Sequence, residues 1–131
     1  MNENRIAVIG LGYVGLPLAH AFSKRYDNVI GIDINENRIN DLVVFNDKTL
    51  ELNSEQLKTT IGNSLYVFSD INEAKDCNIF VVTVPTPITD SKHPDLSPVI
   101  NATKSVATIL KKDDIIIFES TVYPGATEEV C

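Results

Sequence analysis

A glycine-rich turn near the start of the chain has the residue types and spacing of a phosphate-binding site. Residues 10–15 read GLGYVG, which matches the pattern G-x-G-x-x-G. Gly10 would let the chain turn off a strand, Gly12 would let a diphosphate approach the backbone, and Gly15 would let the next helix pack closely. A helix that starts there offers unpaired N–H groups and a partial positive charge. The turn therefore predicts a site for the pyrophosphate of a dinucleotide.

An acidic residue follows the second apolar run, where a dinucleotide site requires one. Asp33 comes directly after the run 29–32, and its carboxylate would accept hydrogen bonds from the ribose hydroxyls of adenosine. Its negative charge would repel a 2′-phosphate, which favours NAD over NADP. Arg38 lies further along and either stacks on the adenine, touches the ribose edge or is a solvated surface side chain. A cation near this site leaves some tolerance for NADP open.

The elements that position these residues alternate between short apolar runs and segments of helical periodicity. Strands are expected at residues 6–9, 29–33, 65–69, 79–84 and 115–118, and helices at residues 13–25, 36–43, 54–61 and 70–76 and from Ser97 onward. We expect Ser97 to be the N-cap of the last of these helices, with Pro98 at its first position. Residues 46–52 are expected to form a loop. This alternation predicts an α/β fold of the Rossmann type, a doubly wound parallel sheet with helices on both faces.

Two later segments follow strands and would therefore face the same ligand. Pro85 and Thr86 belong to a rigid exit from one strand, where the Thr86 hydroxyl would line the ribose or pyrophosphate groove. Ser120 and Thr121 follow the last strand and would lie near the nicotinamide, where a hydride moves. The alternative for these hydroxyls is the ordinary satisfaction of caps and turns.

Composition limits the other classes of function. The chain has 131 residues and a net charge of −7, which fits one domain and argues against a nucleic-acid surface. Cys77 and Cys131 are too few for a disulfide framework, so we expect reduced thiols in the cytoplasm. No signal peptide or bilayer-spanning run is evident, which argues against a membrane partner. His20 and His93 lack metal-ligand spacing, so no metal is expected.

Three stretches together resemble the UDP-glucose/GDP-mannose dehydrogenase family. They are residues 10–19 (GLGYVGLPLA), residues 82–87 (VTVPTP) and residues 119–127 (ESTVYPGAT). The third stretch is most similar to family members that act on UDP-N-acetylhexosamines or their uronates. The resemblance covers the whole chain, and the three motifs occur in the family's order.

The resemblance implies an activity and a role for each matching residue. The family oxidises the C6 hydroxyl of a nucleotide sugar to a carboxylate with two NAD⁺, through a thiohemiacetal on a cysteine of a later domain. By position, residues 10–15, with Tyr13 and Val14 included, would hold the pyrophosphate, and Asp33 and Arg38 would hold the adenosine. Pro85, Thr86, Ser120 and Thr121 would lie along the cofactor toward the nicotinamide. Thr121 is also the candidate for a catalytic role, since its counterpart has been linked to ordering water near the reacting carbon.

The resemblance also implies that this chain is the N-terminal part of a longer enzyme. The central helix, the UDP-sugar-binding domain and the catalytic cysteine of the family have no counterpart in residues 1–131, and Cys131 does not match that nucleophile. A helix expected from Ala126 is also cut short by the end of the chain. We therefore expect one truncated NAD-binding domain over residues 1–131, whose parent binds a UDP-sugar, serves polysaccharide precursor synthesis and forms a homodimer.

Other functions remain compatible with the residues themselves. A regulatory module that binds a nucleotide without chemistry would show the same glycine turn, as would another NAD-dependent dehydrogenase, such as one acting on hydroxyacids. A methyltransferase that uses S-adenosylmethionine fits less well, since its glycine motif usually has a different spacing.

Overall fold

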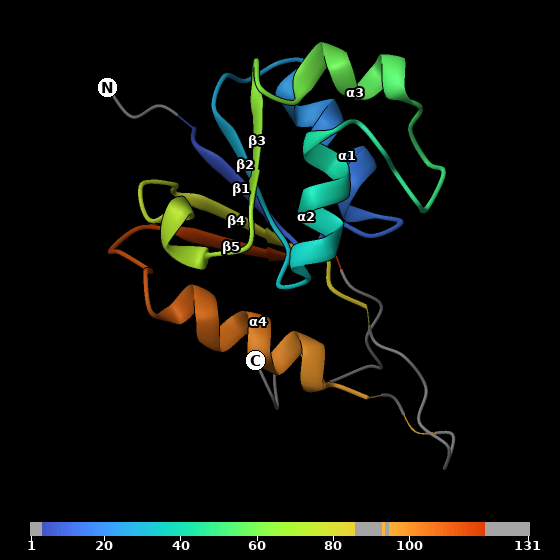
Figure 1. Ribbon diagram of the computed structural model, residues 1–131. Coiled ribbons are helices and arrows are strands. Elements are labelled where there is room, and N and C mark those ends of the chain that lie inside the picture. Colours follow the sequence, from blue (N-terminus) through green and yellow to red (C-terminus); the bar gives the residue numbers. More distant parts are fainter. Residues whose placement is uncertain (1–3, 86–92, 94, 120–131) are drawn as a thin grey trace.

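Five parallel strands form the centre of the part of the chain that the structure describes (Figure 1). The computed structural model describes residues 4–85, 93 and 95–119. The strands are β1 (Ile6–Ile9), β2 (Val29–Ile32), β3 (Leu65–Phe68), β4 (Ile79–Val82) and β5 (Ile115–Phe118), and their order in the sheet is β3-β2-β1-β4-β5. The chain winds outward from β1 through β2 to β3 and then crosses back to β4. The expected doubly wound parallel sheet is therefore confirmed, and its switch point lies between β1 and β4.

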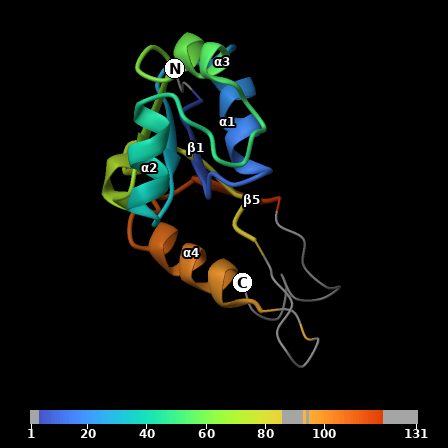
Figure 2. The same cartoon turned by 45° about the vertical axis from the view of Figure 1, so that its right-hand side comes forward.

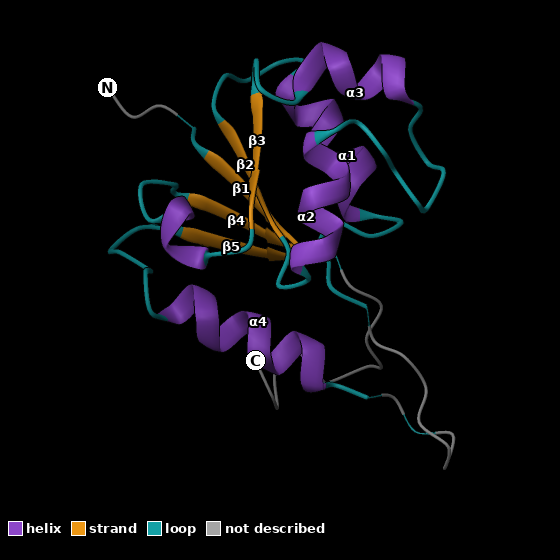
Figure 3. Ribbon diagram, viewed as in Figure 1, coloured by secondary structure: helices purple, strands orange, loops and turns teal. Residues whose placement is uncertain are grey.

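Helices cover both faces of this sheet (Figure 3). One face carries α1 (Gly15–Ser23), α2 (Glu36–Val43) and α3 (Ser54–Thr60). The other face carries α4 (Ser97–Ala107) and the short 3₁₀ helix η1 (Ile71–Ala74). Figure 2 shows α4 on the opposite side of the sheet from α1 and α2. Within the described ranges, no helix is long and apolar enough to cross a membrane.

Apolar side chains from each layer meet in two cores. Leu16, Leu42 and Leu57 come from α1, α2 and α3 respectively, and all three are fully buried against the sheet. On the opposite face, Phe80 of β4 packs in the same cluster as Val106 of α4. Full burial of one such side chain stabilises a fold by roughly 1.5–3 kcal/mol. These cores hold the strands in register, and the register in turn sets which residues meet at the sheet edge.

Three helix predictions differ from the structure. The first helix begins at Gly15 rather than Tyr13, because residues 12–14 form the end of the glycine turn. Ser97 is wrong as an N-cap: it is the first helical residue, Leu96 precedes it without a capping side chain, and Asp95 accepts the Ser97 N–H instead at 2.9 Å. The helix expected over residues 70–76 is the 3₁₀ turn η1.

Candidate functional site

The carboxyl ends of three strands meet at one edge of the sheet. The aligned terminal residues of these strands are Ile9 (β1), Ile32 (β2) and Val82 (β4). The residues that follow are therefore neighbours in space: Gly10, Asp33 and Thr83. In open parallel sheets, ligands bind in the crevice beyond this edge, beside the switch point. The sequence-predicted turn and acid thus lie where a ligand site is expected.

The glycine turn is held in place by hydrogen bonds from both neighbouring strands. Gly10 has a φ of +99°, and its N–H donates to the Ile32 carbonyl at 2.7 Å. The buried Thr83 hydroxyl lies 2.6 Å from the Gly10 carbonyl oxygen and 3.1 Å from that of Ile9. A Cβ on Gly10 would lie 2.9 Å from Val84 Cγ1, so both the positive φ and the close packing require glycine. Thr83 is a site residue that sequence reasoning missed.

Gly15 and Gly12 differ in what surrounds them. A Cβ on Gly15 would overlap the Gly10 carbonyl oxygen and the Thr83 hydroxyl, so Gly15 is needed for α1 to approach the turn. A Cβ on Gly12 would meet no atom within 4 Å. Packing within the described chain therefore explains Gly15 but does not explain Gly12. The open space beside Gly12 fits a diphosphate placed against the backbone.

The first turn of α1 is suited to an anion. The N-cap residue is Val14, which provides no side-chain hydrogen bond to the first N–H groups of the helix. Of these groups, the Leu16 and Leu18 N–H donate to the Gly12 and Val14 carbonyls at 3.2 and 3.3 Å, and Pro17 has no N–H; the start of the helix still carries a partial positive charge. Tyr13 and Val14 flank this turn with 69% and 55% of their surfaces exposed. The backbone donors that remain for an anion at the sheet edge are therefore the N–H groups of residues 13–15, which precede Leu16.

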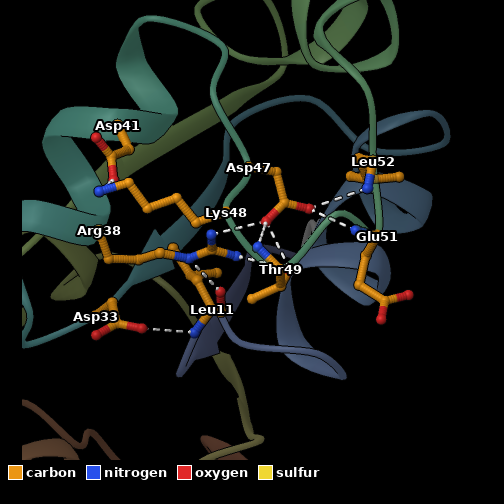
Figure 4. A network of polar contacts seen from close by, with 9 residues as sticks. All are labelled: Leu11, Asp33, Arg38, Asp41, Asp47, Lys48, Thr49, Glu51 and Leu52. Carbon is orange, nitrogen blue, oxygen red and sulfur yellow. Dashed lines mark hydrogen bonds and ion pairs between the residues drawn. The ribbon is translucent and has the colours of Figure 1, made fainter.

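Asp33 and Arg38 hold the two peptide groups on either side of Leu11 in the turn. The Leu11 N–H donates to Asp33 Oδ2 at 3.0 Å, and Arg38 Nε donates to the Leu11 carbonyl at 2.8 Å (Figure 4). The Leu11 side chain is fully buried. Asp33 also accepts the Asn35 N–H at 3.0 Å through Oδ1. A carboxylate has about four acceptor positions, so these two bonds leave room for ribose hydroxyls.

Arg38 is neither a solvated surface side chain nor a free cation. Its side chain is 10% exposed, and Nη1 lies 2.7 Å from Asp47 Oδ1. Its Nη2 lies 3.5 Å from the Thr49 hydroxyl (Figure 4). With Nε bound to Leu11, each of the three guanidinium nitrogens has a partner. Arg38 therefore ties the glycine turn to the chain that follows α2.

Asp47 organises the loop over residues 46–52, which we call the Asp47 loop. Its carboxylate has no exposed surface and accepts the N–H groups of Thr49, Glu51 and Leu52, each at 2.9 Å, as well as the Thr49 hydroxyl. Burial alone would raise the pKa of Asp47, but hydrogen bonds from Thr49, Leu52 and Arg38 outweigh it and lower that pKa from 3.8 to about 2. The sequence predicted this loop but gave no sign of its central acid.

The lowered pKa of Asp47 predicts a loss of stability in acid. Because the folded pKa lies below the unfolded value, the stabilisation is complete above about pH 4 and is lost as the pH falls toward 2. The difference corresponds to about 2 kcal/mol. Urea denaturation of the wild type and Asp47→Asn should show a gap in unfolding free energy that narrows by about that amount between pH 5 and pH 2. A gap that stays constant over this range would contradict the assignment.

Of the other residues predicted to bind the coenzyme, one lies in the part of the chain that the structure describes. Pro85 follows β4 at the ligand edge and is exposed. Thr86, Ser120 and Thr121 lie outside the described residues. Among the described residues, no three of the types His, Cys, Asp and Glu come together as a metal site.

One groove lies away from this edge. This groove of about 850 Å³ runs between α1 and α3, and Asp27 and Ser64, which precede β2 and β3, help to line it. It therefore lies at the amino ends of the strands. Within it His20 Nδ1 lies 3.0 Å from the Thr60 hydroxyl, and burial and then the charge of Lys24 lower the pKa of His20. This contact connects α1 to α3 and does not involve the glycine turn.

Comparisons with known proteins agree with this geometry. A family model described as "UDP-glucose/GDP-mannose dehydrogenase family, NAD binding domain" matches residues 4–131. UDP-N-acetyl-D-glucosamine 6-dehydrogenase from Pseudomonas aeruginosa is 50% identical over 131 residues, which are 100% of this chain and 30% of that protein. UDP-N-acetyl-D-mannosamine dehydrogenase from Yersinia pestis is 35% identical over 130 residues, 99% of this chain and 31% of that protein.

A solved structure of a related dehydrogenase has the same fold over almost the whole chain. UDP-D-ManNAc dehydrogenase from Pyrococcus horikoshii superimposes with a TM-score of 0.89 at 36% identity, over 96% of this chain and 30% of that one. The chain thus spans about 30% of the length of these relatives.

Proposed function

Because this chain belongs to the UDP-glucose/GDP-mannose dehydrogenase family and is similar to its NAD-binding domain, we propose that it binds NAD(H) for a nucleotide-sugar 6-dehydrogenase. The parent enzyme would oxidise the C6 hydroxyl of a UDP-sugar to a carboxylate, and bound NAD⁺ would accept the hydride. The chain spans about 30% of its relatives, so it supplies the coenzyme site and not the whole reaction.

The observation that carries this proposal is the open side of Gly12 beside the uncapped first turn of α1. Space for a ligand and backbone donors for a diphosphate occur there together. Thr83 and the Ile32 carbonyl hold Gly10, so the turn needs little reorganisation when the pyrophosphate binds. Preorganisation of this kind lowers the entropic cost of binding.

The adenosine would lie beside Asp33. The carboxylate already orients the Leu11 peptide and keeps acceptor positions for the two ribose hydroxyls. A 2′-phosphate would bring further negative charge against this carboxylate, so NAD should be preferred to NADP. We propose that Thr86, Ser120 and Thr121 extend the site toward the nicotinamide and that Thr121 helps to order water at the reacting carbon.

The substrate and the setting of the parent enzyme follow from the relatives. The relative from Pseudomonas aeruginosa is named for UDP-N-acetyl-D-glucosamine, which supports a UDP-N-acetylhexosamine as substrate and polysaccharide precursors as product. We propose a homodimer for the full-length protein.

We also propose that the protein works in the reducing cytoplasm. Cys77 is a buried free thiol, and burial raises its pKa to about 11, so it stays protonated at neutral pH.

Titration of the chain with NAD⁺, NADP⁺ and a UDP-sugar tests the coenzyme assignment. We expect calorimetry to show NAD⁺ binding that is tighter than NADP⁺ binding, and no oxidation of the UDP-sugar. Asp33→Ala should weaken NAD⁺ binding about tenfold, because the ribose loses a charged acceptor. Asp27→Ala is the matched control, since it removes the same charge from an exposed position at the opposite edge of the sheet.

Two results would contradict this proposal. One is a wild-type chain that does not bind NAD⁺. The other is equal weakening by Asp33→Ala and Asp27→Ala, which would indicate a general effect of charge rather than a contact. Tight binding of the UDP-sugar by this chain alone would instead contradict the assignment of residues 1–131 to the coenzyme.

A further inference from the structure

Arg38 stands beside the predicted adenosine site, where an arginine commonly accommodates the 2′-phosphate of NADP. To do so, a guanidinium presents two neighbouring N–H groups to the phosphate oxygens. In this structure Nε is bound to the Leu11 carbonyl and Nη1 to Asp47, while Nη2 faces the Thr49 hydroxyl. Three of the five N–H groups therefore have a partner, with at least one of them on each edge that joins two nitrogens.

The Asp47 loop holds the arginine in that position through a carboxylate that is itself fixed. The Asp47 carboxylate is fixed by the N–H groups of Thr49, Glu51 and Leu52, so it does not depend on Arg38 for its orientation. Its Oδ1 lies 2.7 Å from Nη1, with the Asp47 side chain fully buried and that of Arg38 10% exposed. A preorganised carboxylate can hold a guanidinium with little loss of freedom. The charges of Asp47 and Arg38 compensate each other. Of the two side chains that bond to Leu11, Asp33 is then the one whose charge has no ion-pair partner (Figure 4).

We propose that Asp47 is a specificity-determining residue, which excludes NADP by holding Arg38 on the glycine turn and away from a 2′-phosphate. Asp47 acts through Arg38 and is therefore a positioning residue rather than a coenzyme contact. This inference rests on the proposed coenzyme function and adds a second source of discrimination to the charge of Asp33. It also explains why an arginine near the ribose does not make the site suitable for NADP.

The ratio of the two dissociation constants, NADP⁺ over NAD⁺, is the measurement that tests this role. A purely structural role of Asp47 would weaken both coenzymes by the same factor and leave the ratio unchanged. In Asp47→Asn, the charge of Arg38 is no longer compensated by a carboxylate and its Nη1 is held less strongly, so the guanidinium can turn to the 2′-phosphate; the ratio should fall about tenfold, the effect of one charge-assisted hydrogen bond. Asp47→Glu keeps the charge and should retain most of the discrimination.

Asp41→Asn is the matched control. Asp41 pairs with Lys48 at 3.2 Å in the same region, and the hydrogen bonds and ion pair of the Arg38 side chain involve neither of them (Figure 4). The substitution removes one negative charge, as Asp47→Asn does, but it leaves the guanidinium bound. The ratio should therefore stay at the wild-type value.

Arg38→Gln tests the inference independently, in case Asp47→Asn does not fold. If Asp47 keeps Arg38 from the 2′-phosphate, Arg38→Gln should weaken NAD⁺ and NADP⁺ by the same factor. Selective weakening of NADP⁺ would show that Arg38 already contacts the phosphate, which would overturn the inference. Where both single variants fold, adding Asp47→Asn to Arg38→Gln should not change the ratio further.

The failure of this inference can be distinguished from that of the proposed function. A wild-type chain that binds no NAD⁺ overturns both. A wild-type chain that binds NAD⁺ and whose ratio is unchanged in Asp47→Asn overturns only the role of Asp47. A ratio that falls equally in Asp41→Asn also overturns it, because the effect would then arise from net charge.

Discussion

Gly15→Ala should destabilise the fold by about 3 kcal/mol or more, a large fraction of the stability of a small domain. The added methyl group would overlap the Gly10 carbonyl oxygen, a backbone atom, and the Thr83 hydroxyl. Neither can move easily, because Gly10 is bonded to β2 and Thr83 is buried at the end of β4. The start of α1 must then move away from the sheet, which also disturbs the donors of its first turn.

The midpoint and slope of urea denaturation measure this effect. Gly31→Ala is the comparison, because a Cβ there would lie 3.0 Å from the end of the flexible Leu11 side chain rather than from backbone. Its cost should be clearly smaller than that of Gly15→Ala. Similar stability for the wild type and Gly15→Ala would show that α1 does not pack against the turn as described.

The sheet and the glycine turn could be predicted because their signals are local. The strands are short apolar runs between glycine, proline and polar residues, and the order of elements in the chain determines a parallel sheet with right-handed crossovers. Gly10, Gly12 and Gly15 belong to a spacing whose physical causes are known. Asp33 could be placed at the ligand edge because it directly follows a strand, and strand ends are fixed by register.

The part of the site that could not be predicted depends on contacts between distant residues. Asp47 lies in a segment without periodicity, and its role appears only when the loop folds back on Arg38. Thr83 was assigned to a strand, but its hydroxyl serves the turn after β1, more than 70 residues earlier. Arg38 could be a contact or a surface residue by spacing alone, since nothing local shows that its nitrogens are already bound. The error at Ser97 is local instead: Asp95 accepts the Ser97 N–H, and α4 begins one residue earlier than a cap at Ser97 would allow.

Gly12→Ala should separate coenzyme binding from folding, which no other glycine of the turn allows. The Cβ at this position meets no atom within 4 Å, and the backbone of Gly12 is outside the positive-φ region. Alanine also lowers the conformational entropy of the unfolded chain, so the stability of the free protein should stay the same or rise by up to about 1 kcal/mol. A variant with normal stability gives a binding measurement that misfolding does not affect.

The affinity of Gly12→Ala for NAD⁺ should fall on the order of a hundredfold, because the methyl group occupies the space where the pyrophosphate approaches the backbone. Calorimetry with NAD⁺, beside thermal melting of the free chain, measures both quantities on one preparation. Unlike Asp47→Asn, this change should weaken NAD⁺ and NADP⁺ by the same factor, since both carry the same pyrophosphate. If Gly12→Ala kept wild-type affinity, the diphosphate would lie elsewhere and the open side of Gly12 would have no part in binding. Preserved stability with lost affinity would instead mean that this glycine is required for the ligand and not for the fold.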